Sequence, residues 1–173
     1  MSLQKKMTIE QLNAADRAAF VAAVGFTFEE SPWIAEAAWQ RRPFADARAL
    51  LASMIDVVQA APEQRRVALI RAHPDLAGRV AREGRLGAAS TQEQSAAGLD
   101  RLTPPEIARF DELNAAYRAR FGFPFVICAR EQAKEAILAA LERRLANDRE
   151  TEIATALGEI EKIARLRLLD AIE

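Results

Sequence analysis

The spacing of apolar residues follows the helical period over most of the chain. In the segment 45–61, ADARALLASMIDVVQAA, five apolar residues recur at helical spacing and predict a buried stripe: Leu50, Leu51, Met54, Val57 and Val58. The segment 62–74 predicts a second helix, with Val67, Leu69 and Ile70 facing inward and a proline ending it. Segments 131–148 and 151–172 are long and amphipathic, and one apolar face is predicted along the first, formed by Ile137, Leu138, Leu141 and Leu145.

Three interruptions separate these helical patterns. The stretch 81–90, AREGRLGAAS, contains two glycines and predicts a loop that feeds a new helix. In DRLTPPE, Thr103 and Glu106 have the spacing of a capping box, and Ser31 with Pro32 marks an earlier helix start. The third break, RFGFPFVICAR at 120–130, is rich in aromatic and β-branched residues and has no partner strand nearby.

These patterns predict an all-α fold. We expect one domain over residues 1–173, a bundle of about seven or eight helices with a single short extended connector at the third break. Ala, Leu, Arg and Glu dominate the composition, and all four are strong helix formers.

Composition narrows the class of protein. The 24 basic and 25 acidic residues nearly balance, which argues against a dedicated nucleic-acid binder. One cysteine and one histidine exclude an internal disulfide and make a His/Cys zinc site implausible. Apolar runs are far shorter than the roughly 18 residues that suggest a membrane span, and no targeting signal is evident. We therefore expect a cytoplasmic protein that binds neither nucleic acid nor membrane.

The single histidine, His73, lies in RAHPDLAG at the end of a predicted helix. By itself, a histidine at this place is more often a favourable cation at the negative end of the helix dipole than a catalyst. Pro74, however, pushes the residue before it towards an extended backbone and fixes the angle at which His73 leaves the helix. Histidine is also the side chain best suited to proton transfer near neutral pH.

The segment 90–100, STQEQSAAGLD, allows two interpretations. Ser90 and Glu93 have capping-box spacing, which predicts a helix that begins at Ser90. A helix N-terminus with a hydroxyl nearby is also a natural seat for a substrate carboxylate, and a glutamate there can orient a histidine.

The connector at 120–130 and the last predicted helix also contain candidate substrate-binding residues. Core packing explains the side chains of FGFPFVICAR. Its backbone N–H and C=O groups have no neighbouring strand to pair with, so they are available to hydrogen-bond a planar polar ligand. Cys128 is interpreted as a small buried thiol, since no second histidine exists to serve it as a base. Arg165 and Arg167 are solvated or ion-paired in the simplest interpretation, although one of them is able to face an anionic substrate.

Together, RAHPDLAG, STQEQSAAGLD and LNAAYRARFGFPFVICAR closely resemble the signature stretches of the 2-oxo-4-hydroxy-4-carboxy-5-ureidoimidazoline (OHCU) decarboxylases of urate breakdown. The resemblance runs in order from FTFEESPWIAEAAW to EIEKIARLRL and so covers nearly the whole chain. It implies an all-helical homodimer without a metal or organic cofactor. It also implies the reaction, in which OHCU loses CO2 and is protonated to give (S)-allantoin.

The resemblance assigns roles to residues of this chain. His73 falls on the catalytic acid, and Pro74 lies beside the ligand. We expect Glu93 to hold the imidazole in its working orientation, with Arg167 as a further substrate-binding residue, although which of Arg165 and Arg167 reaches the substrate stays open. The remaining expected substrate-binding residues are Ser90, Thr91, Gln92 and Gln94 of the second motif, and Phe125, Val126, Ile127, Cys128 and Ala129, through their backbone.

The chemistry is compatible with a chain that offers no cofactor motif, because the substrate's own C=N bond accepts the electrons left by CO2. Two alternatives remain: a helical ligand-binding protein of the same fold without activity, and a lyase or hydrolase acting on a related ureido compound. The presence of all four motif residues, His73, Ser90, Glu93 and Gln94, disfavours the inactive ligand-binding protein but does not exclude the related lyase or hydrolase.

Overall fold

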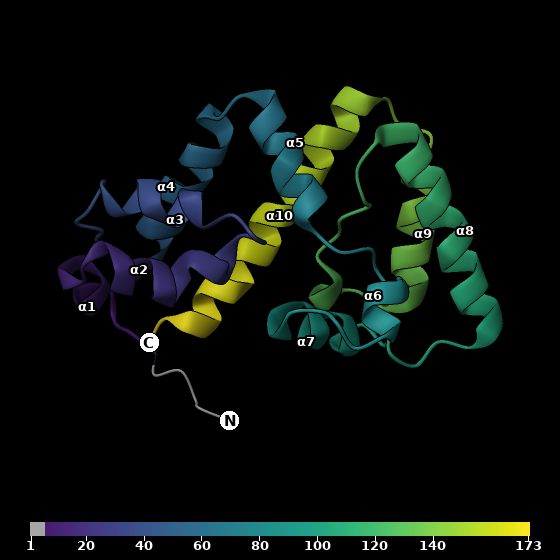
Figure 1. Cartoon of the computed structure of the whole chain (residues 1–173), viewed down its shortest axis with the longest axis horizontal. Helices are drawn as coiled ribbons and strands as arrows, with labels where there is room; N and C mark the ends of the chain where they lie inside the picture. The colour runs from purple at the N-terminus through teal and green to yellow at the C-terminus, as the bar shows by residue number, and fades with distance from the viewer. Residues whose placement is uncertain (1–5) are drawn as a thin grey trace. The chain divides into compact units, whose positions relative to one another are not determined.

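The structure, a computed structural model, describes residues 6–173, apart from the side chain of Val80. Within these residues the chain is all-α, as predicted, and its only β-type pairing is an isolated bridge between Met7 and Ile172 (Figure 1). Eight α-helices have eight residues or more, in agreement with the predicted seven or eight. The α-helices are α1 (Ile9–Ala14), α2 (Arg17–Val24), α3 (Pro32–Trp39), α4 (Ala47–Ala60), α5 (Glu63–Ala72), α6 (Arg79–Arg82), α7 (Ala88–Ala96), α8 (Pro104–Phe121), α9 (Lys134–Arg144) and α10 (Arg149–Ala171); the 3-10 helices are η1 (Gly25–Thr27) and η2 (Ala129–Glu131).

The chain forms two compact units. The first comprises Met1–Ala72 and Glu161–Glu173, and the second comprises His73–Ile160. A single domain over residues 1–173 therefore stays a prediction. Among the described residues, no helix is both long enough and apolar enough to cross a membrane.

In the first unit, α3 packs against both α2 and α4. Asp16 and Asp46 cap α2 and α4 through their carboxylates, and Ser31 and Pro32 begin α3 as predicted. The helices of this unit bury apolar side chains that include Leu12, Phe20, Ile34, Leu50 and Met54. The stripe predicted for residues 45–61 is confirmed, with Leu51 less buried than its four neighbours.

In the second unit, α8 and α9 lie side by side (Figure 1). Thr103 and Glu106 form the predicted capping box at the start of α8, and Gly122 ends this helix with a positive φ of 78°. The connector that follows, residues 122–128, contains neither helix nor strand, as predicted. Its aromatic side chains pack in one cluster with Tyr117 and Phe121 of α8: Phe123 and Phe125.

The predicted start of α7 is wrong. The helix begins at Ala88 with Gly87 as its N-cap, so Ser90 and Glu93 do not form a capping box. Ala88 and Ala89 favour helix, and the extended backbone of Gly87 (φ −61°, ψ 157°) supplies the cap geometry without a side chain. Ser90 therefore lies inside the first turn of α7, where it is buried.

Candidate active site

His73 is the first residue beyond α5 and is buried, with 6% of its surface exposed. The helix ends at Ala72, as the proline at position 74 predicts. The turn that follows, residues 73–78, contains Ala77 in the left-handed region at φ 53°, an unusual conformation for a residue with a Cβ. His73 thus stands at the start of a turn whose backbone path must be fixed by its neighbours.

Side chains from two helices hold this turn. The Ala77 N–H donates to Gln94 Oε1 of α7 at 2.9 Å, and Asn114 Nδ2 of α8 donates to the Leu76 carbonyl at 2.9 Å. Gln94 and Asn114 are both buried, so these bonds are shielded from water. Gln94, a predicted substrate-binding residue, therefore also has a structural role in the turn of His73.

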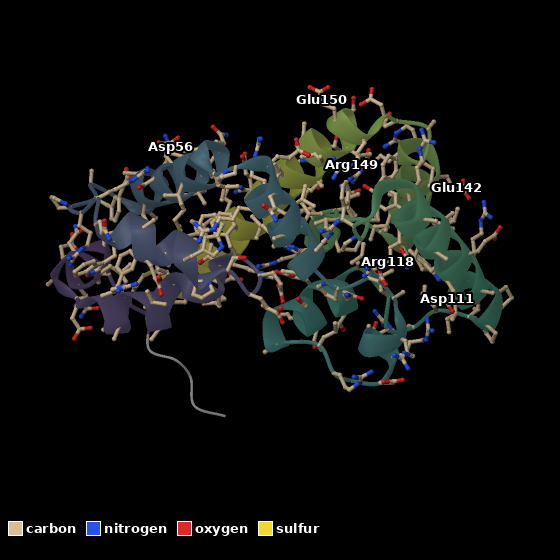
Figure 2. The ribbon with its side chains drawn as sticks, turned by 45° about the horizontal axis from the view of Figure 1, so that its top comes forward. Asp56, Asp111, Arg118, Glu142, Arg149 and Glu150 are labelled. Atoms are coloured by element: carbon tan, nitrogen blue, oxygen red, sulfur yellow. The ribbon has the colours of Figure 1, made fainter. Side chains whose placement is uncertain are left out.

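Charged groups near the surface add to this support. Arg118 of α8 (labelled in Figure 2) donates from Nε to both carboxylate oxygens of Asp75, at 2.9 and 3.2 Å. Arg82 of α6 donates to the Ala77 carbonyl at 2.7 Å and pairs with Asp111 of α8 at 2.9 Å. Both backbone polar groups of Ala77 are therefore satisfied, the N–H by Gln94 and the carbonyl by Arg82.

Helix α7 carries the second predicted motif. Ser90 and Gln94 are buried, Glu93 is half-buried, and Thr91 and Gln92 are exposed. The Thr91 hydroxyl donates to the Gly87 carbonyl at 3.0 Å, within the first turn of its own helix. Helix α7 packs against η2, which directly follows the connector. Unit 2 thus brings together the turn of His73, the second motif and the connector.

A cavity of about 440 Å³ lies beside α7. Thr91, Gln94 and Ser95 are among its lining residues, and Ser95 donates to Asp100 at 2.7 Å inside it. Neither His73 nor Glu93 lines this cavity. The cavity lining thus includes two of the predicted substrate-binding residues, Thr91 and Gln94, but not the predicted acid.

The connector residues predicted to contact the substrate are all buried: Phe125, Val126, Ile127, Cys128 and Ala129. Cys128 is buried as expected for an inert thiol. Its N–H donates to Glu159 Oε2 of α10 at 2.8 Å. This donor is therefore already engaged by a carboxylate of the protein.

A buried cluster of charged residues contacts the connector. Arg144 of α9 donates from Nη1 to the Val126 carbonyl at 2.8 Å, and its guanidinium stands 4.4 Å from the centroid of the Phe125 ring. It also forms an ion pair with Glu152 of α10 at 2.9 Å, and Glu152 has no exposed surface. Arg144 therefore joins the connector to α10.

Two further side chains complete the hydrogen bonding of Glu152. The Tyr117 hydroxyl donates to Glu152 Oε2, and Asn147 Nδ2 donates to Oε1 at 2.8 Å. Burial, and after it the bond to Glu152, raise the pKa of Tyr117 above its ordinary value, while Arg144 acts in the opposite direction. Tyr117 therefore remains a neutral donor to the carboxylate.

Sequence reasoning did not identify Arg144, Glu152 or Glu159. Arg144 stands in ERRLAND and Glu152 in TEIATAL, where each resembles a residue of a solvated helix face. The only signal in the sequence is indirect: a buried connector without ladder partners needs side chains that satisfy its backbone groups.

Arg167 belongs to the other unit and is 4% exposed. Its Nη1 pairs with Glu29 at 2.8 Å and lies 3.3 Å from the Phe26 carbonyl. Arg165 is exposed. The ion-paired interpretation of Arg167 is therefore confirmed, and its contact with a substrate stays a prediction.

The residues described in 6–173 include no group of three or more His, Cys, Asp or Glu side chains able to hold a metal ion.

Comparison with known proteins gives consistent matches. The family model described as OHCU decarboxylase matches residues 13–169. A protein of Halalkalicoccus jeotgali named 2-oxo-4-hydroxy-4-carboxy-5-ureidoimidazoline decarboxylase is 42% identical, over 94% of this chain and 90% of its own length. A human protein with the putative form of the same name is 44% identical, over 96% of both chains.

Solved structures are similar as well. A crystal structure of (S)-allantoin synthase superposes with a TM-score of 0.79 at 30% identity, over 96% of this chain. The present chain spans about half of that one, 54%. A crystal structure of OHCU decarboxylase in the presence of (S)-allantoin has a TM-score of 0.67 at 22% identity, which supports the fold alone.

Proposed function

The chain belongs to the OHCU decarboxylase family, and we propose that it converts OHCU to (S)-allantoin and CO2 in urate degradation. The family match over residues 13–169 is the observation that carries this proposal. The arrangement in unit 2 supports it, because the turn of His73 is hydrogen-bonded to α7 and α7 packs against η2.

The proposed reaction needs little chemistry from the protein beyond orientation and a proton. The bond between the ring carbon and the carboxylate breaks, CO2 leaves, and the electron pair moves towards the neighbouring C=N bond. The ring nitrogen of that C=N bond takes up a proton, which leaves an enol with a C=C bond to the carbon that carries the ureido group. That carbon then receives a proton on one face, which creates the S centre, while the ring hydroxyl loses its proton and becomes a carbonyl. Orientation and stabilisation of the developing charge are the usual contributions of an enzyme to such a step.

We assign the proton to His73 and the orientation of its imidazole to Glu93. Ser90, with Thr91, Gln92 and Gln94, would hold the polar groups of the substrate, beside Pro74 and the connector backbone. Arg167 would neutralise the substrate's negative charge. Because Gln94 also bonds the Ala77 N–H, a substrate that contacts Gln94 is coupled to the turn of His73.

The activity test uses OHCU generated in situ from urate by urate oxidase and the following hydrolase. Circular dichroism then follows the chirality of the allantoin formed, because spontaneous decay gives a racemic product. An excess of (S)-allantoin and faster CO2 release are expected. Tight binding of allantoin without faster release would instead indicate the inactive ligand-binding protein of the same fold.

The His73→Gln variant tests the assigned acid. We expect it to fold, since glutamine is similar in size and polar, and to lose about 10²–10⁴-fold in kcat. The thermal midpoint shows whether the variant is folded, and stereoselective allantoin formation measures its turnover. A folded His73→Gln protein with nearly full kcat would contradict the assignment.

We also propose the two finer predictions made from the sequence, a homodimer and a cytoplasmic location. Light scattering on the eluting protein tests the first: a dimer has twice the 19.1 kDa mass of one chain. Fractionation of the source cells tests the second.

A further inference from the structure

Two buried or half-buried carboxylates of α10, Glu152 and Glu159, reach the connector. They are seven residues apart, which is close to two helical turns, so they lie on the same face of α10 about 10 Å apart. Glu152 acts through Arg144 on the Val126 carbonyl, and Glu159 accepts directly from the Cys128 N–H. One helix face therefore fixes the connector at two points that flank Ile127.

The planarity of the peptide bond gives these two contacts a consequence for Ile127. The Val126 carbonyl shares its peptide plane with the Ile127 N–H, and the Ile127 carbonyl shares its plane with the Cys128 N–H. The only cis bond among the described residues is Arg42–Pro43, so both planes are trans and their N–H and C=O point in opposite directions. The Ile127 N–H is thus directed away from Arg144, and its carbonyl away from Glu159.

We propose that Arg144, Glu152 and Glu159 are positioning residues, which set the orientation of the two peptide groups of Ile127 and so the polar edge that the connector offers to a substrate. This inference rests on the proposed function for its substrate. The clamp formed by these three residues is itself a property of the free protein. Arg144 and Glu159 touch the connector, Glu152 acts through Arg144, and the connector in turn would touch the substrate.

Charged groups are suited to this role. A hydrogen bond to an ionised group is stronger than a neutral one, and it becomes stronger still when water is excluded. A connector without ladder partners would otherwise bury its carbonyl and amide groups unpaired. The clamp therefore holds an irregular segment in one conformation where no sheet is available to do so.

The test uses Glu159 first, because its side chain is only half-buried and its variants are expected to fold. Glu159→Gln keeps an acceptor without the charge, and Glu159→Ala removes both. We expect exchange of the Cys128 amide, followed by NMR in the free protein, to quicken about tenfold in Glu159→Ala and less in Glu159→Gln. In the activity assay, the kcat/KM of Glu159→Ala should fall by about the same factor, mainly through a rise in KM. Glu159→Gln should retain more of the wild-type kcat/KM than Glu159→Ala does.

Glu150→Gln is the matched control, since Glu150 is an exposed carboxylate at the start of the same helix (Figure 2). A second pair of variants, at Arg144 and its neighbour Arg143, tests the clamp independently of Glu159. Arg144→Lys keeps the charge but loses the two-pronged geometry, whereas Arg143→Lys changes its exposed neighbour on α9. A rise in KM is expected for Arg144→Lys but not for Arg143→Lys.

Unchanged amide exchange and unchanged KM in Glu159→Ala would overturn the clamp. The exchange measurement involves no substrate, so it decides this point even in a preparation without activity. A wild-type protein that forms no excess of (S)-allantoin would instead contradict the proposed function, and the two failures are therefore distinguishable.

Discussion

The turn of His73 and the connector are both irregular segments of unit 2, and they are held in different ways. The turn, residues 73–78, is fixed by neutral side-chain amides, Gln94 and Asn114, and by an ion pair at the surface. The connector, residues 122–128, is fixed by Arg144 and Glu152 in the interior and by Glu159. The turn thus combines buried neutral amides with partly exposed charged groups, whereas the support of the connector is charged and largely buried.

The two kinds of support differ in how much free energy it costs to break one contact of the segment. A neutral hydrogen bond contributes about 1 kcal/mol, so the turn is able to shift by small amounts when Gln94 changes its partner. A buried charge cannot lose its partner without a large desolvation penalty, so the contacts of the connector with the Arg144–Glu152 pair are costly to break. The candidate proton donor thus stands on the segment whose contacts are weaker individually, and the connector is held by the charged cluster.

The largest effect is expected when the buried pair loses one member. Arg144→Ala leaves the Glu152 carboxylate, which has no exposed surface, without its counter-ion. We expect the free energy of unfolding to fall by about 3–5 kcal/mol in urea titrations. Arg143→Ala, an exposed neighbour on the same helix, should change it by less than about 0.5 kcal/mol. Equal effects of the two variants would remove the distinction between the segments.

A smaller loss is expected on the side of the turn. Asn114→Ala removes the donor to the Leu76 carbonyl and leaves that carbonyl unpaired, which costs about 1–3 kcal/mol. The lower end of this range is expected, because Asn114 Oδ1 is buried without a hydrogen-bond partner and its removal relieves that burden. The same urea titration measures the change. A loss as large as that of Arg144→Ala would show that the turn is as rigid as the connector.

Alkaline pH tests the connector cluster through its tyrosine. Tyr117 is the only tyrosine of the chain, so tyrosinate absorbance near 295 nm reports on it alone. Its pKa is raised in the folded protein, whereas the unfolded chain releases the proton near pH 10, so stability from this group is full below pH 10 and declines above it. The decline is at most about 1.4 kcal/mol per pH unit.

We expect no tyrosinate signal at pH 10–11 while the protein is folded, and a signal near pH 10 in urea. The Tyr117→Phe variant should lack this part of the alkaline loss of stability. Titration of folded Tyr117 near pH 10 would contradict the buried hydrogen bond to Glu152.

The smallest effect is expected at the surface ion pair of the turn. The side chains of Arg118 and Asp75 are 47% and 29% exposed, so Arg118→Ala should cost only about 0.2–1 kcal/mol. Salt at about 1 M should reduce this difference, because the screening length is then about 3 Å. A cost that persists in high salt would indicate packing by the arginine stem in place of charge.

Regular features of the fold were predictable because they depend on local sequence. The end of α5 at Ala72 follows from a proline, and the start of α8 follows from the spacing of Thr103 and Glu106. The start of α7 was missed, since a glycine N-cap leaves no side-chain signature and Ser90 offered a plausible one.

The candidate site residues were named from sequence motifs and stay predictions, whereas the residues that support their backbone were not identifiable from the sequence. His73 and the segment 90–94 are recognisable because they match a family pattern at several positions. The burial of Arg144 and Glu152 depends on where α9 and α10 meet the connector, which no periodicity within either helix reveals. Charged residues are predicted to be exposed by default, and the cluster is an exception that tertiary packing creates.

The left-handed backbone of Ala77 has a consequence for protein engineering. Glycine adopts this conformation without strain, so Ala77→Gly relieves about 1 kcal/mol in the native state and loses a similar amount through the greater entropy of the unfolded chain. Net stability is then nearly indifferent to the exchange, yet the two residues differ in the number of conformations that they allow. Alanine narrows the ensemble of the turn that carries His73, and a programme that selects variants on melting temperature alone would not detect the loss of that order.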